Sequence, residues 1–191
     1  MLVERIIGAF TFRRQVYTDV ERDNTFTMTA WLLVAVVAFL NQLGSQASTG
    51  VFNWLGSTVV GTVWSVISFG VAAYVMSWMG RALFKAEVSF AELVRTLGLA
   101  YVWTIVIVIG VLAGVSGILS FLLTPVLIVG WVMLVLSWFV AAKEALDLSI
   151  VKTIVTVALG WLTFGIIMAV GSWLLTLIGL SAAGVGRMFG F

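Results

Sequence analysis

The chain has 191 residues, of which 62% are hydrophobic and only 9% are charged, with a mean hydropathy of +1.20. A soluble domain is about 45–50% apolar and about 25% charged, so this composition excludes a soluble enzyme and indicates a protein of the lipid bilayer. Histidine and cysteine are both absent, which removes imidazole bases, thiolate nucleophiles and sites that bind metals or cofactors through these residues. Ten cations against eight anions are too weak a basic balance for a nucleic-acid-binding protein.

Residues 1–25 are predicted to form a cytoplasmic amphipathic segment. Apolar residues recur there at three- and four-residue spacing, namely Leu2, Val3, Ile6, Ile7, Phe10 and Tyr17. Charged residues fall at other positions. This pattern is typical of a helix that lies on the inner surface of a membrane, and a disordered tail is the alternative.

The charged residues leave three long uncharged stretches, at 24–80, 96–142 and 153–186. A helix needs about 20 apolar residues to cross the hydrocarbon core of a bilayer, so the first two stretches allow two crossings each and the third allows one. The predicted fold is therefore all-α, a bundle of five transmembrane helices near 27–47, 57–79, 96–118, 125–142 and 152–178. This transmembrane domain occupies 26–180, and a short external tail follows at 181–191.

Local signals mark where two of these helices begin. Thr124 is the predicted N-cap of the fourth span and Pro125, the only proline, its first helical residue. Ser89 and Glu92 have the spacing of a capping box that starts a helix leading into the third span.

The distribution of the cations predicts the orientation. With a cytoplasmic N-terminus, nine of the ten cations lie inside and only Arg187 lies outside, as the positive-inside rule requires. Five crossings then place the C-terminus outside, in a cytoplasmic membrane. The candidate residues of the cytoplasmic face are Arg81, Lys85, Glu92, Arg95, Lys143, Glu144 and Asp147.

Gly110, Gly114 and Gly117 form a predicted small-residue face on the third span, where helices approach closely within the bundle or between protomers. Apart from Lys152 at the first residue of the fifth span, Tyr74 and Tyr101 are the only ionisable residues within the predicted spans, which argues against pumps, proton-coupled transporters and intramembrane proteases. No catalytic, metal-binding or cofactor-binding residue is predicted. The carboxylates of the loop at 143–152 lack a visible base, nucleophile or metal-ligand partner.

Tryptophans fall into two predicted groups. One group lies near span ends and is predicted to occupy the headgroup boundary, namely Trp31, Trp54, Trp78, Trp103, Trp131 and Trp138. Trp64, Trp161 and Trp173 lie nearer mid-span, where lipid, a partner helix and a hydrophobic pigment all remain alternatives.

Two inner segments, Gly80–Tyr101 (GRALFKAEVSFAELVRTLGLAY) and Ala141–Lys152 (AAKEALDLSIVK), together with the stretch 16–23, resemble the Yip (Ypt-interacting protein) family of membrane proteins, in particular its bacterial branch. The resemblance covers about residues 5–178 and implies a five-span bundle with a cytoplasmic N-terminus. The proline that often follows the Gly-x-Ala step of the family is missing after Ala100. Eukaryotic relatives bind prenylated small GTPases through a longer N-terminal region, so GTPase binding is not transferred to this chain.

The predicted function is that of a non-enzymatic integral membrane protein that acts by protein–protein or protein–lipid interaction. It would work as a homo-oligomer or as an accessory subunit of a larger membrane complex, with membrane lipids and other integral membrane chains as its partners. The alternative is a channel or facilitator for a neutral or lipidic solute, lined by serines and threonines of the second and fifth spans.

Overall fold

The structure is a computed structural model that describes residues 2–45, 51–109 and 117–177. Every regular element in these ranges is helical, which confirms the all-α prediction. The elements in chain order are α1 (Leu2–Phe10), α2 (Arg14–Arg22), α3 (Phe26–Ser45), α4 (Val51–Phe84), α5 (Phe90–Ala100), the 3₁₀-helix η1 (Tyr101–Ile109), α7 (Gly117–Leu146) and α8 (Ile150–Leu177).

Four of the helices, α3, α4, α7 and α8, are long and apolar enough to cross a membrane. With 30 residues, α7 is about 45 Å long, which matches a bilayer including its headgroup layers. The chain is therefore a polytopic helical membrane protein by length and composition.

The segment formed by α5 and η1 runs end to end and packs between α3 and α7. Its 11 α-helical and nine 3₁₀ residues together extend for about 35 Å, because a 3₁₀-helix rises further per residue than an α-helix. This segment has as many residues as α3 and fewer than α4, α7 and α8, and its length is comparable to the thickness of the hydrocarbon core.

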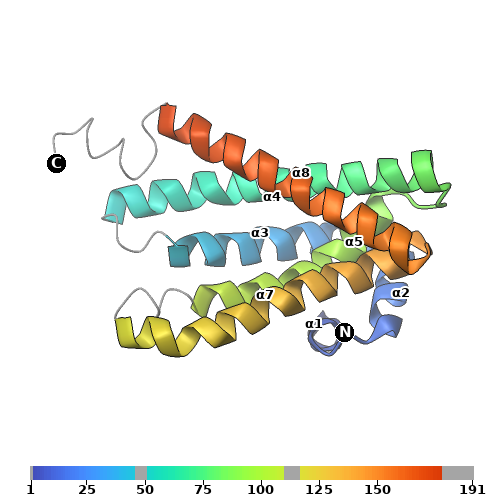
Figure 1. The fold of residues 1–191 in the computed structure, drawn as a ribbon, viewed down its shortest axis with the longest axis horizontal. Coiled ribbons are helices and arrows are strands. Elements are labelled where there is room, and N and C mark those ends of the chain that lie inside the picture. Colours follow the sequence, from blue (N-terminus) through green and yellow to red (C-terminus); the bar gives the residue numbers. More distant parts are fainter. Residues whose placement is uncertain (1, 46–50, 110–116, 178–191) are drawn as a thin grey trace.

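One end of the bundle carries α1, α2 and the turns at 85–89 and 147–149, and it is called the charged end below (Figure 1). The last residues of α8 lie at the opposite end. Helix α8 lies obliquely across α4, while α7 and α8 meet at the charged end and diverge from it (Figure 1). The contact between α4 and α8 is close, since Gly160 lies directly against the side chain of Met76.

The N-terminal residues form two short helices where the sequence predicted one. Phe12 adopts a left-handed backbone with φ of 54°, which ends α1, and the amide of Arg13 donates to the Gly8 carbonyl at 2.9 Å. This is a common way to stop a helix. The break lets α1 and α2 pack against different parts of the bundle.

Two predictions around the fourth span are wrong. Helix α7 begins at Gly117, so Pro125 lies inside the helix and Thr124 donates its hydroxyl to the Ser120 carbonyl instead of capping a helix. The apolar residues before the proline continue the helix, since transmembrane helices tolerate an internal proline. Gly117 therefore belongs to α7 and not to the third span, and a Cβ added there would meet no described atom within 4 Å. Gly110 and Gly114 lie outside the described residues.

The core of the bundle is aromatic. Phe69 of α4 contacts both Tyr101 of η1 and Trp138 of α7, with ring centroids 5.6 and 6.0 Å apart. Trp138 in turn lies 5.3 Å from Trp161 of α8. Trp138 is 2% exposed, so its predicted place at the headgroup boundary is wrong, because α7 is longer than the predicted span and places this residue well inside the bundle.

Candidate functional site

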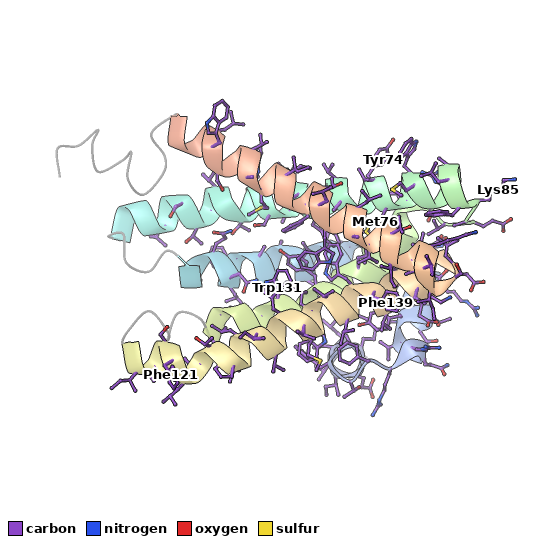
Figure 2. The ribbon with its side chains drawn as sticks, in the orientation of Figure 1. Tyr74, Met76, Lys85, Phe121, Trp131 and Phe139 are labelled. Carbon is purple, nitrogen blue, oxygen red and sulfur yellow. The ribbon has the colours of Figure 1, made fainter. Side chains whose placement is uncertain are left out.

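The predicted cytoplasmic-face residues all lie at the charged end, but they do not form one cluster. Arg81 occupies the last turn of α4, where its Nε donates to the Ser77 carbonyl at 3.2 Å. Lys85 follows in the turn, at the extreme end of the molecule (Figure 2). Asp147 is exposed in the other turn. These three residues have separate surroundings and form no shared binding site.

Arg95 is the exception, because it is buried. Its side chain is 3% exposed, and two of its nitrogens donate to the backbone carbonyl of Glu21 in α2, the Nε bond being 3.0 Å long. The remaining nitrogen donates to the Thr27 hydroxyl of α3 at 3.2 Å. A buried guanidinium needs such partners to offset its lost hydration. Arg95 thus joins α2, α3 and α5 and has a structural role.

Glu92 caps the same helix. The Ser89 hydroxyl accepts from the Glu92 amide at 3.2 Å, and the Glu92 carboxylate accepts from the Ser89 amide at 2.7 Å. The predicted capping box is confirmed. Both groups therefore stabilise the start of α5.

A further carboxylate, Glu21, lies close to this junction and was not singled out from the sequence. Partial burial raises the pKa of Glu21, and the neighbouring carboxylate of Glu92 adds to the rise, while Arg22 and Arg95 oppose it. The carboxylate is therefore less stable in the folded chain than in water. Its main structural contribution is its backbone carbonyl, which receives Arg95.

An ion pair links α1 to the start of α3. Arg5 donates to Asp23 at 2.8 Å and its guanidinium lies 4.9 Å from the ring centroid of Phe26. Asp23 also accepts from the Thr25 hydroxyl and amide. The bond from Thr25, followed by that from Arg5, lowers the pKa of the Asp23 carboxyl. These contacts fix the chain where it leaves the N-terminal helices and enters the bundle.

Two hydrogen bonds that involve aromatic side chains join the N-terminal helices α1 and α2 to the bundle. The Tyr17 hydroxyl of α2 lies 3.0 Å from the Ser137 hydroxyl of α7, in a fully buried position. Ser137 also donates to the Ala100 carbonyl, at the junction of α5 and η1. On the other side, the Trp103 indole donates to the Ala9 carbonyl of α1 at 3.2 Å. No sequence pattern predicted these two contacts, because the residues of each pair are 120 and 94 positions apart.

Serine and threonine hydroxyls inside the bundle are mostly used within their own helices. Those of Thr62, Ser65 and Ser68 in α4 donate to the carbonyl four residues earlier, and the same holds for Thr156, Thr163 and Ser172 in α8. This is the usual arrangement of such residues in apolar helices. These bonded hydroxyls give little support to a polar path between the two helices.

The charged end includes two further cations on the last α-helical hairpin. Lys143 lies near the end of α7, next to Glu144, whose carboxylate is 3.6 Å from the Nε of Arg14. Lys152 lies in the first turn of α8, with its ammonium 5.7 Å from the ring centroid of Phe84. Among the described residues no group of three or more histidine, cysteine or acidic side chains could hold a metal ion.

An apolar groove lies between α7 and α8. It has a volume of about 510 Å³ and is lined almost entirely by apolar atoms of Trp131, Val135, Leu136, Phe139, Ile154, Val157, Ala158 and Trp161. Its aromatic residues Trp131 and Phe139 lie along one stretch of α7 (Figure 2). No sequence pattern predicted this groove, because α7 and α8 are apolar on nearly every face.

These features define a polytopic helical membrane protein, with two short N-terminal helices, α1 and α2, packed at its charged end and an apolar groove between α7 and α8. No family model, no curated protein and no solved structure matches the chain. The resemblance to the Yip family therefore stays a prediction from the two inner segments.

Proposed function

We propose that the chain crosses the membrane five times, with the α5–η1 segment as the third crossing and the charged end in the cytoplasm. Two observations support this topology. Every charged residue that the structure describes, which is each one except Arg187, lies at the charged end. The α5–η1 segment is about 35 Å long, enough to cross a hydrocarbon core of about 30 Å.

The absence of cysteine from the sequence makes this topology directly testable. Glu87→Cys lies in the exposed turn at the charged end, and Gly117→Cys lies at the first residue of α7, at the other end. A membrane-impermeant maleimide should label Gly117→Cys in intact cells and Glu87→Cys only after the cells are opened. The reverse pattern, or equal labelling of the two variants from outside, would contradict the proposal.

Within this topology, the proposed activity is non-enzymatic. The protein acts by contact with other membrane components, as a homo-oligomer or as an accessory subunit. The observation that carries this proposal is the use of the polar groups. Arg95, Tyr17 and Ser137 are engaged in bonds that hold the helices together, while the open surface of α7 and α8 is apolar, with exposed side chains such as Phe121. Large apolar surfaces of this kind are suited to contacts with lipid or with other transmembrane helices.

Purification in a mild detergent tests the interaction. We expect the full chain to emerge as a discrete oligomer or with a stoichiometric partner chain, as measured by light scattering and mass spectrometry. A clean monomer without partner chains would overturn the proposal. The alternative of a facilitator for neutral solutes would instead require flux of small neutral solutes into vesicles that contain the purified chain.

A further inference from the structure

The groove between α7 and α8 has the dimensions of one leaflet of the bilayer. Along α7 it extends from Trp131 to Phe139, which is about 12 Å, and the acyl region of one leaflet is about 15 Å deep. Its volume of about 510 Å³ is in the range of small-ligand sites. The groove therefore offers room for one flexible apolar chain in the leaflet next to the charged end.

The position of the groove along α7 places it just below a headgroup layer. Phe139 is seven residues from the end of α7 at Leu146, and Lys143 is three residues from that end. These spacings correspond to about 10 and 5 Å along the helix axis. Since α7 is as long as the whole bilayer, Phe139 falls within the hydrocarbon and Lys143 falls within the headgroup layer.

The charges at this end of the groove favour an anionic headgroup. Lys143 follows Phe139 by four residues, so it lies on the same side of α7, closer to the charged end. Glu144, the next residue, is turned toward α2, where its carboxylate pairs with Arg14. Lys152 of α8 lies toward α4, with its ammonium 5.7 Å from the ring centroid of Phe84. Lys143 is therefore the cation on the groove side of α7.

We propose that this groove binds an acyl chain of an anionic phospholipid of the cytoplasmic leaflet, with the headgroup against Lys143. A second copy of the chain fits less well. In a dimer whose symmetry axis runs along the membrane normal, each side chain meets residues of the partner at its own depth in the bilayer. Phe121, the most exposed apolar side chain of α7, lies about 15 Å from Trp131 along the helix. It therefore lies at the wrong depth to enter the groove of a partner protomer. This inference rests on the proposed orientation for the choice of leaflet, but it does not depend on oligomers or partner chains.

The first test asks whether the groove is the binding site. The full chain is placed in nanodiscs of phosphatidylcholine and phosphatidylglycerol with identical acyl chains, extracted gently, and examined by native mass spectrometry. Ala158→Phe fills the groove, and Ala169→Phe is its matched control, three turns further along an exposed part of the same helix. We expect Ala158→Phe to lose the bound lipid and Ala169→Phe to keep it. Equal lipid retention by the two variants would overturn the proposal.

The second test asks whether the headgroup contacts Lys143. A preference of about fivefold for phosphatidylglycerol over phosphatidylcholine is expected from this one lysine contact. Lys143→Gln should lower that preference by about fivefold and keep the acyl chain bound, whereas Lys85→Gln, in the other turn, should leave it unchanged. The proposal is wrong if the unaltered chain binds both lipids equally. It is also wrong if a photoreactive group at Val135 crosslinks to a second protein chain and not to lipid.

Discussion

The guanidinium of Arg95 is bonded to the backbone carbonyl of Glu21, across 74 positions of sequence. It joins an N-terminal helix that lies outside the long spans to the start of the α5–η1 segment. The bond does not use the Glu21 side chain, so the residue type at position 21 is free to change while the link is kept. Arg95 itself cannot change in this way, because its planar fork contacts two elements at once.

Arg95→Lys should release the N-terminal helices from the bundle. A lysine ammonium cannot reproduce the bonds to both Glu21 and Thr27, and the loss of charge-assisted bonds at a buried site should lower the free energy of unfolding by about 2–3 kcal/mol. The measurement is thermal unfolding in detergent together with limited proteolysis of residues 11–25. Arg81→Lys is the control, since that side chain is bonded only to its own helix among the described residues. Equal stability of the two variants would show that the Arg95 bonds contribute little.

Tyr17→Phe should weaken the attachment of α2 to the bundle at its contact with α7. The phenol lies 3.0 Å from the Ser137 hydroxyl and both are buried, so loss of the bond should cost about 1 kcal/mol. A double-mutant cycle with Ser137→Ala separates this bond from general packing effects. We expect a coupling energy of about 0.5–1.5 kcal/mol between the two substitutions. Strictly additive effects would mean that the two hydroxyls do not interact.

Composition and charge spacing were sufficient to predict the all-α membrane class, because a bilayer imposes long apolar helices. They also predicted the capping box at Ser89 and Glu92, since that motif depends on residues close in sequence. The interior of α7 was predicted less well. Proline is a reliable helix start in soluble proteins, but inside a transmembrane segment Pro125 is accommodated within the helix.

Most contacts of the candidate site could not be predicted from the sequence. Arg95 was assigned to a cytoplasmic face, because its position next to the third span says nothing about burial, and the structure shows it enclosed by α2 and α3. The groove depends on the angle at which α8 leaves α7. An apolar helix carries no pattern that reveals which face is covered by a neighbour and which is left open.

Glu21→Gln should stabilise the protein slightly at neutral pH. Burial raises the pKa of this carboxyl above its ordinary value of 4.5, so the folded state favours the protonated form and the carboxylate destabilises it above that pH. Glutamine removes the charge and keeps the carbonyl that receives Arg95. Because the site is partly exposed, the gain should be no more than about 0.5 kcal/mol.

The pH dependence distinguishes this effect from a general one. The advantage of Glu21→Gln should be largest at pH 7 and should shrink as the pH falls toward 4.5, where the unaltered carboxyl gains its proton. Asp23 behaves in the opposite way, since its lowered pKa gives stability that is lost in acid. Asp23→Asn should therefore destabilise the protein at pH 7. A Glu21→Gln variant that is less stable than the unaltered chain at pH 7 would contradict the sign of the shift.

Gly171→Ala should disrupt the packing of α8 against α4. A Cβ at this position would overlap the indole of Trp64, whose Nε1 donates to the Ile167 carbonyl of α8 at 2.6 Å. The indole must move and lose that bond, so we expect a loss of about 1–3 kcal/mol in the free energy of unfolding. Gly165→Ala is the matched control on the same helix, because nothing described lies within 4 Å of its added Cβ, and it should be neutral or stabilising by up to about 1 kcal/mol. Tryptophan fluorescence during thermal unfolding in detergent measures both variants. The close contact between the two helices would be disproved if Gly171→Ala were as stable as Gly165→Ala.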